Sequence, residues 1–311
     1  MAQGRKRGPF KETVESLFIT IGLALVIRAG VVYPFKIPTE SMVGSLLKGD
    51  HILCNKFVYG IRTPDWIGIP YTEIGFDVPH TRLPGFRNPQ AGDVVIFKYP
   101  RDRSEYYVKR CIATSGDTVE IRDRVTYING KAAIRNENEQ YISGQVLPPT
   151  YQQDGLFPPG ETNIHQYGPL RIPQPGDRFT FTDSNRAQWF QWMNLMLYED
   201  QRVTVTWQGK THHMEAAQID QWPRLVAQLP ADAFQINGRS LLGYQYAVQD
   251  RQFFMMGDNR DNSLDSRFWG FLPARYVVGQ ALIKYWSWDA DKPLYQLPDK
   301  VRWNRLLGLI D

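Results

Sequence analysis

One long apolar run and many short alternating runs divide the chain. The long run is "SLFITIGLALVIRAGVVYPF", residues 16–35, and Arg28 is its one charged residue. Because the run is apolar on every face, a core helix with one polar side is disfavoured. A cleavable signal peptide is the alternative, but no convincing small-x-small site follows the apolar core. We therefore expect a transmembrane helix over 13–34, with Tyr33 as an interfacial anchor.

The short runs predict strands. "GDHILCNKF", "GDVVIFKYP", "YYVKRCIATSGD" and "VTYINGKAAI" alternate or are rich in β-branched residues, and Gly, Pro and Asn-Gly bound them. The same pattern returns in "RQFFMMGDN" and "YVVGQALIKYW". We expect a mostly β protein, with an antiparallel core formed by residues 35–134 and 250–311.

Residues 135–249 differ in composition, being rich in Gln and Pro. One helix is predicted over 184–198, where Phe190, Met193 and Leu197 share a face. A hairpin is predicted in "RVTVTWQGKTHHMEA", and a second Asn-Gly turn follows in "QINGRSL". We interpret this stretch as an α+β cap inserted into the core.

Charge sets the expected orientation. The 311 residues carry a formal net charge of +4, and the basic residues cluster only near the N-terminus, at Arg5, Lys6, Arg7 and Lys11. The positive-inside rule then makes residues 1–12 cytoplasmic and everything after Pro34 extracytoplasmic. No stripe of Lys and Arg marks a nucleic-acid surface, so we expect no nucleic-acid partner.

Cysteine and histidine offer little chemistry. Cys54 and Cys111 each lie in an apolar run, which favours buried free thiols, although a disulfide between them is the alternative. The five histidines show no spacing typical of a metal site. We therefore expect neither a metal nor another cofactor.

Two residues are candidates for catalysis. Ser41 lies in "KIPTESMVGSL", directly after the apolar run, and is either a turn residue or a nucleophile. Lys109 shares a strand face with Tyr107 and Cys111, so it either snorkels to water or is a desolvated amine. As a base, its pKa must fall from about 10.4 towards ~7–8. A Ser–His–Asp site would have to use His51, and no G-x-S-x-G elbow surrounds Ser41.

The densest polar stretch is "GDNRDNSLDSRFWG", residues 257–270. Its aspartates lack the central Gly and closing Glu of a calcium loop. A network in which carboxylates pair with guanidiniums fits better. Such a network could hold one hydroxyl, Ser263 or Ser266, against a neighbouring group.

Together these motifs resemble the bacterial type I signal peptidases, membrane-anchored serine proteases with a Ser–Lys dyad. The order is the family's: an N-terminal span, "IPTESM", "GDHILCNK", "GDVVIFKYP", "YYVKRCIATSGD" and "GDNRDNSLDSRFWGFLP". The likeness covers about 36–60, 92–134 and 253–288, and 135–249 falls in the family's variable cap. One departure is Val43-Gly44 after Ser-Met, where the family often has Pro, which leaves the rigidity of this turn open.

The resemblance assigns a role to each site residue. Ser41 is implied to be the nucleophile and Lys109 its general base. The hydroxyl of Thr39 would complete an oxyanion hole with the Ser41 N–H, and Ser263 would orient the Lys109 amine. Asp265 and Arg267 would form a pair that supports this loop.

The resemblance also implies the partners and the compartment. The substrates would be preproteins with signal peptides, bound as an added strand with small residues at the first and third positions before the cut. The protein would cross the bacterial plasma membrane once and work as a monomer. The alternative from another class is a non-catalytic anchored β-scaffold that binds a partner through its cap.

Overall fold

The computed structural model describes residues 13–20, 32–61, 63, 66–68, 75–78, 82–289 and 291–310. Residues 13–20 are helical, whereas residues 1–12 and the centre of the transmembrane helix expected over 13–34 lie outside the described residues. Within the described ranges, no helix combines the length and the apolar character needed to cross a bilayer. The membrane span therefore stays a prediction.

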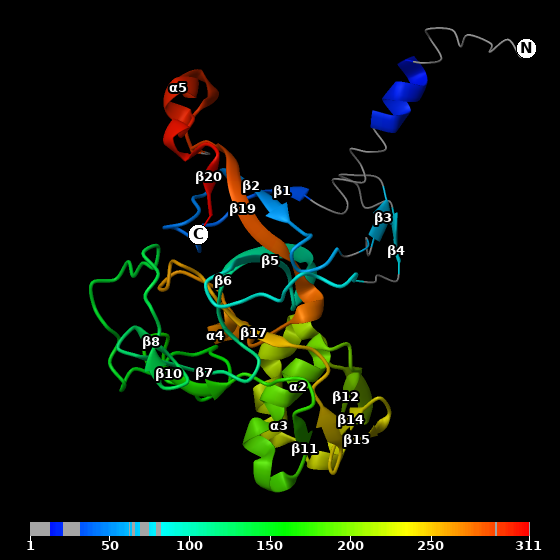
Figure 1. Ribbon diagram of the computed structural model, residues 1–311. Coiled ribbons are helices and arrows are strands. Elements are labelled where there is room, and N and C mark those ends of the chain that lie inside the picture. The colour runs from blue at the N-terminus through cyan, green and yellow to red at the C-terminus, as the bar shows by residue number, and fades with distance from the viewer. Residues whose placement is uncertain are drawn as a thin grey trace, which may run out of the picture.

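The largest sheet has eight strands. In spatial order they are β1 (Val32–Lys36), β2 (Asp50–Asn55), β19 (Val277–Ser287), β5 (Val94–Tyr99), β6 (Asp102–Thr114), β17 (Gln252–Met256) and β18 (Leu272–Pro273), with β20 (Gly308–Leu309) beside β19. Every pair in it is antiparallel. The mostly β, antiparallel core is thereby confirmed, and the late strand β19 lies between the early strands β2 and β5 (Figure 1).

A second sheet joins the core to the insert. Its order is β10 (Tyr167–Arg171), β7 (Thr118–Arg122), β8 (Val125–Ile128) and β9 (Lys131–Ala132). Asn129 and Gly130, with φ of 54° and 77°, form the predicted tight turn between β8 and β9. Because β10 comes from the insert and pairs with β7, this sheet crosses the expected boundary at residue 134.

The insert contains both helices and strands. The helix expected over 184–198 is a 3₁₀ segment, Asp183–Gln188, followed by α2 (Trp189–Tyr198). A second helix, α3 (Trp222–Gln228), follows another 3₁₀ segment, Ala216–Gln221, and was not predicted. The predicted hairpin is present as β12 (Val203–Trp207) and β13 (Lys210–His213). The remaining strands of the insert are β14 (Phe234–Ile236), β15 (Arg239–Ser240), β11 (Arg178–Thr180) and β16 (Gln245–Ala247).

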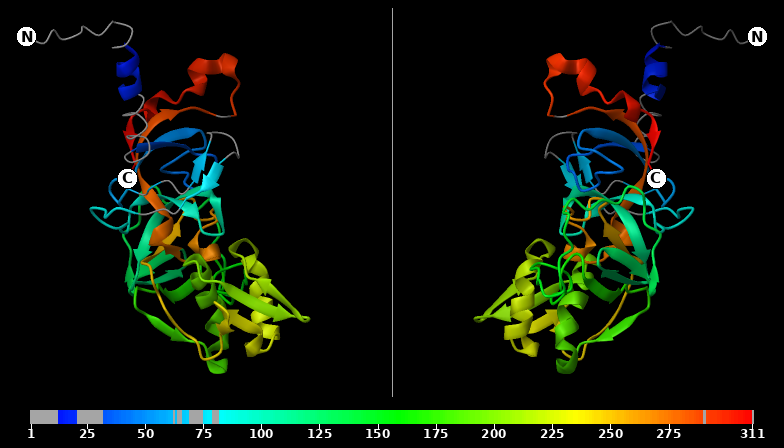
Figure 2. Two further views of the ribbon diagram at one scale, coloured as in Figure 1. Left: turned by 90° about the vertical axis from the view of Figure 1, so that its right-hand side faces the viewer. Right: turned by 90° about the vertical axis from the view of Figure 1, so that its left-hand side faces the viewer.

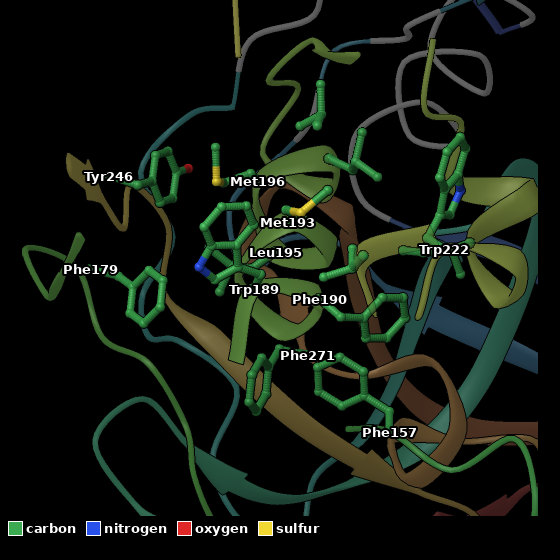
Figure 3. Close-up of a cluster of buried hydrophobic side chains, with 14 of the residues drawn as sticks. Phe157, Phe179, Trp189, Phe190, Met193, Leu195, Met196, Trp222, Tyr246 and Phe271 are labelled. Atoms are coloured by element: carbon green, nitrogen blue, oxygen red, sulfur yellow. The ribbon is translucent and has the colours of Figure 1, made fainter. Parts of the chain in front are cut away.

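Helix α2 is the centre of the insert's core. Figure 3 shows aromatic and methionine side chains gathered around it, among them Trp189, Phe190, Phe157 and Phe271. The helix is buried on nearly every side, whereas the sequence predicted a single apolar face of three residues. Each large apolar side chain that is fully buried contributes roughly 1.5–3 kcal/mol. Because Phe254, Met256 and Phe271 of the core belong to the same cluster, this burial fixes the insert on the core.

Short elements complete the part of the chain that the structure describes. These are the hairpin β3 (Trp66–Gly68) and β4 (Gly75–Asp77), helices α4 (Ser266–Trp269) and α5 (Leu297–Lys300), and 3₁₀ turns at Ala231–Ala233, Ala274–Tyr276, Leu294–Gln296 and Trp303–Arg305. Helix α5 and the helical residues 13–20 lie towards one end of the molecule, and the insert lies at the other (Figure 2). The large sheet occupies the middle.

Candidate active site

Ser41 lies in a tight turn between β1 and β2. The N–H groups of Val43 and Ser45 donate to the carbonyls of Glu40 and Met42, at 3.1 Å each. Met42 and Leu46 are buried in an apolar cluster beneath the turn. These two apolar anchors fix the turn while the polar Ser41 faces outward, partly exposed.

Lys109 reaches Ser41 from β6. Its Nζ lies 2.5 Å from Ser41 Oγ, and the residue is only 4% exposed. On the same face, the ring of Tyr107 has its centroid 5.5 Å from Nζ, and Cys111 is buried. Burial lowers the pKa of Lys109 to about 8, since water no longer solvates the ammonium. The structure thus brings the two predicted residues together and lowers the pKa of the amine to about 8.

The Thr39 hydroxyl stands beside the serine. Thr39 Oγ1 and Ser41 Oγ are 3.4 Å apart, at the long limit for a hydrogen bond. Thr39 is exposed, so its hydroxyl can turn towards a bound group. The oxyanion role expected for Thr39 stays a prediction.

Ser263 is close to the site but makes no bond to the lysine. Its Oγ is buried and has no hydrogen-bond partner among the described residues. Gly257 lies between Ser263 and the serine turn. A Cβ at Gly257 would meet Ser263 Oγ at 2.3 Å and the Ser41 carbonyl oxygen at 2.4 Å. Only glycine fits between them. An unpaired buried hydroxyl next to Ser41 leaves the orienting role of Ser263 as a prediction.

The expected pair of Asp265 and Arg267 is present and fully buried. Arg267 Nε and Nη2 donate to the two carboxylate oxygens of Asp265 at 2.9 and 2.8 Å. Burial by itself raises the pKa of the Asp265 carboxyl, but the Arg267 guanidinium outweighs this effect and lowers it below its ordinary value. Asp265 also accepts from the N–H of Gly257 at 3.1 Å. The pair therefore holds the loop at the point where it passes Ser41.

A second buried ion pair could not be predicted from the sequence. Arg110 donates to both carboxylate oxygens of Asp258, at 2.8 and 2.9 Å, and to Ser45 Oγ at 2.8 Å. The contact ties three segments together: β6, the loop and the serine turn. The crowding of carboxylates in residues 257–270 indicated that partners were needed. Local sequence could not identify Arg110 as one of them.

The dyad opens into a cleft of about 560 Å³. Its walls are formed by Phe35, Lys36, Ile37, Pro38, Thr39, Glu40, Ser41, Met42, Glu105, Tyr106, Tyr107, Val108, Lys109, Asn262 and Leu264. Strand β17 pairs with β6 only from Arg110 to Thr114, so the edge of β6 at Val108 and Lys109 borders the cleft. A cleft between a strand edge and an extended segment suits a peptide in extended form.

The alternative chemistries do not meet at this cleft. His51, the histidine considered as a base, packs against the rings of Tyr285 and Trp288 and does not line the cleft. Cys54 and Cys111 are free and buried, in agreement with the thiol interpretation. Burial raises the pKa of the Cys54 thiol to about 12, so this thiol stays protonated at neutral pH.

Comparison with known proteins gives consistent matches. A family described as "Signal peptidase, peptidase S26" matches residues 10–286. Signal peptidase I of Buchnera aphidicola is 29% identical over 299 residues, covering 96% of this chain and 81% of that protein. Signal peptidase I of Pseudomonas aeruginosa is 28% identical over 295 residues, with 92% and 75% covered. A solved signal peptidase I from Enterococcus faecalis is 18% identical and covers 62% of this chain and 97% of that chain, but its TM-score of 0.25 is too low to bear on the fold.

Proposed function

Since the chain belongs to the signal peptidase family, peptidase S26, and is therefore a peptide hydrolase, we propose that it removes signal peptides from exported preproteins with Ser41 and Lys109 as its catalytic dyad. The observation that carries the assignment of the dyad is the 2.5 Å approach of a buried lysine amine to a serine hydroxyl. A non-catalytic scaffold would need neither that contact nor the burial of Lys109.

The mechanism follows from the lowered pKa. When neutral, Lys109 accepts the proton of Ser41 Oγ, and the oxygen attacks the carbonyl carbon of the scissile bond. The negative charge on the carbonyl oxygen would be stabilised by the Ser41 N–H and by Thr39. Lys109 then gives its proton to the leaving amine, which produces an acyl-enzyme on Ser41. Water, deprotonated by the same amine, releases the signal peptide and restores the serine.

Substrate would bind as an extended strand along Val108 and Lys109. The cleft walls at Ile37 and Met42 are apolar and so suit uncharged side chains beside the cut. That these side chains are small is what the family resemblance implies. The reaction needs no metal or other cofactor in this scheme.

The location of the enzyme is part of the proposal. The apolar run over 13–34 would anchor the chain in the bacterial plasma membrane, with residues 1–12 in the cytoplasm. The cleft would then lie just outside the bilayer, where preproteins emerge. One chain carries every residue of the dyad and its supports, which is consistent with a monomer.

The test uses the purified full-length protein in detergent and a preprotein with an Ala-x-Ala site. The parent protein should release the mature chain with the expected N-terminus, as read by mass spectrometry, and Ser41→Ala should release none. A serine-directed acylating probe should label the parent and fail to label Lys109→Ala, while His51→Ala should react like the parent. Cleavage by Ser41→Ala within tenfold of the parent rate would refute the assignment.

A further inference from the structure

A short stretch of the insert lies against both halves of the candidate site. We name residues 138–143 the strap. It follows β9 in sequence and precedes β10. The dyad uses none of its side chains, and the sequence predicted only that the strap belongs to the cap.

The strap contacts the serine turn at Gly44. This glycine has φ of +117°, a conformation that disfavours side chains. A Cβ on Gly44 would lie 2.2 Å from the carbonyl oxygen of Asn138. The departure from the family's Pro therefore does not leave the turn loose, because the backbone of the strap packs directly on it.

The strap also pairs with the loop behind Ser41. Gln140 donates its N–H to the carbonyl of Asp258 at 2.8 Å and accepts from the N–H of Arg260 at 2.9 Å, which forms a parallel β-bridge opposite Asn259. Further along, the N–H of Ser143 donates to the carboxylate of Asp261 at 2.8 Å. The strap is thus hydrogen-bonded to three residues of the loop, Asp258, Arg260 and Asp261.

A buried ion pair reinforces this bridge. Glu139 Oε2 lies 2.9 Å from Arg260 Nη2, and the two side chains are 8% and 3% exposed. The neighbour of Arg260, Asn259, holds the serine turn twice. Its N–H donates to the Ser41 carbonyl and its side-chain amide donates to the Glu40 carbonyl, both at 3.1 Å.

We propose that the strap is a positioning element for the nucleophile, and that Glu139 is its central positioning residue. Glu139 fixes Arg260, the bridge at Gln140 fixes Asn259, and Asn259 fixes the carbonyl of Ser41. The insert is then part of the active-site framework, in addition to being a cap. Only the kinetic test of this inference rests on the proposed function.

The test compares Glu139→Gln with Glu137→Gln. The control residue lies two positions away, is exposed, and loses the same charge. Because a small misplacement of a reacting group can cost about a hundredfold, Glu139→Gln should lower kcat by roughly 10- to 100-fold and leave KM within about twofold. Amide exchange of residues 41–46 should become faster in Glu139→Gln and stay unchanged in Glu137→Gln.

A second pair of variants checks the route. Arg260→Gln should lower kcat by a similar factor, and adding Glu139→Gln to it should change kcat by less than about twofold, because the ion pair is already broken. Glu139→Asp keeps the carboxylate on a shorter side chain. It should give an intermediate loss, and it replaces Glu139→Gln if that variant does not fold.

Three outcomes overturn the proposal: equal kcat and equal exchange in the Glu139 and Glu137 variants, a lower melting temperature with unchanged kcat, or fully additive losses at Glu139 and Arg260. If the parent protein cleaves no preprotein, the proposed function fails. The exchange comparison still decides whether the strap holds the turn.

Discussion

At the scale of single residues, the chemistry depends on whether one buried amine carries a proton. Lys109 has a pKa lowered by burial to about 8, and only its neutral form can accept the proton of Ser41. Below pH 8, kcat/KM should therefore rise about tenfold per pH unit, and it should level off above that value. A pH profile of cleavage measures this limb. A flat profile between pH 6 and 9 would argue against a lysine base, as would substantial activity in Lys109→Arg, whose guanidinium keeps its proton.

The same amine should reduce the stability of the fold. Its folded pKa of about 8 lies below the ordinary 10.5, so between these values the unfolded chain binds more protons and stability rises with pH. Below pH 8 the buried ammonium costs about 3 kcal/mol, since each pKa unit corresponds to about 1.4 kcal/mol. Lys109→Met should therefore be inactive but about 2–3 kcal/mol more stable at pH 7. The gain should shrink towards pH 10.

Denaturant unfolding of the two proteins at pH 7 and pH 10 measures that difference. A matched control is Lys98→Met on the neighbouring strand β5, since the Lys98 side chain is only partly buried. If Lys109→Met were less stable than the parent at pH 7, the buried amine would not destabilise the fold.

At the scale of elements, the loop 257–267 divides its two serines between different tasks. Ser266 Oγ accepts from the N–H of Met255 at 2.9 Å, whereas the buried Ser263 Oγ has no partner among the described residues. Ser263→Ala should lower kcat by one to three decades with little loss of stability, because the hydroxyl is available to orient Lys109. Ser266→Ala should instead cost about 1–3 kcal/mol of stability, since it leaves a buried N–H unsatisfied.

Both effects can be read from the same two variants, by cleavage kinetics and by denaturant unfolding. If Ser266→Ala lost more kcat than Ser263→Ala while remaining folded, the roles assigned within this loop would be reversed.

The elements also show which features could be predicted from the sequence. The alternating runs predicted the strands of the core, and the Asn-Gly pairs predicted the turns, because each depends on neighbours in sequence. Ser41 and Lys109 could be proposed as partners on motif order. The pairing of Arg110 with Asp258 and of Glu139 with Arg260 could not, because it joins segments more than a hundred residues apart. Helix α3 was missed since it is short and begins at a Trp-Pro pair.

At the scale of the whole molecule, changes at the far end of the insert should not affect catalysis. The hairpin β12–β13 belongs to the part of the insert that lies away from β1 and β2 in Figure 1. Its tip, Gln208-Gly209, is exposed. Exposed loop tips tolerate insertions, so a short peptide inserted between these two residues should leave cleavage within about twofold of the parent. A strong loss would mean that the tip contacts substrate or partner, in conflict with the cleft described above.

The position of β19 has a consequence for the order in which a growing chain can become active. Ser41 is synthesised early and Lys109 later, yet β19, residues Val277–Ser287, lies between the strand that follows the serine and the strand that precedes the lysine. A nascent chain that ends at Tyr276 has both dyad residues but lacks the strand that joins their halves. It should therefore resist labelling by the acylating probe, whereas the full-length chain is labelled. Translation itself would then delay proteolysis until β19 has been synthesised.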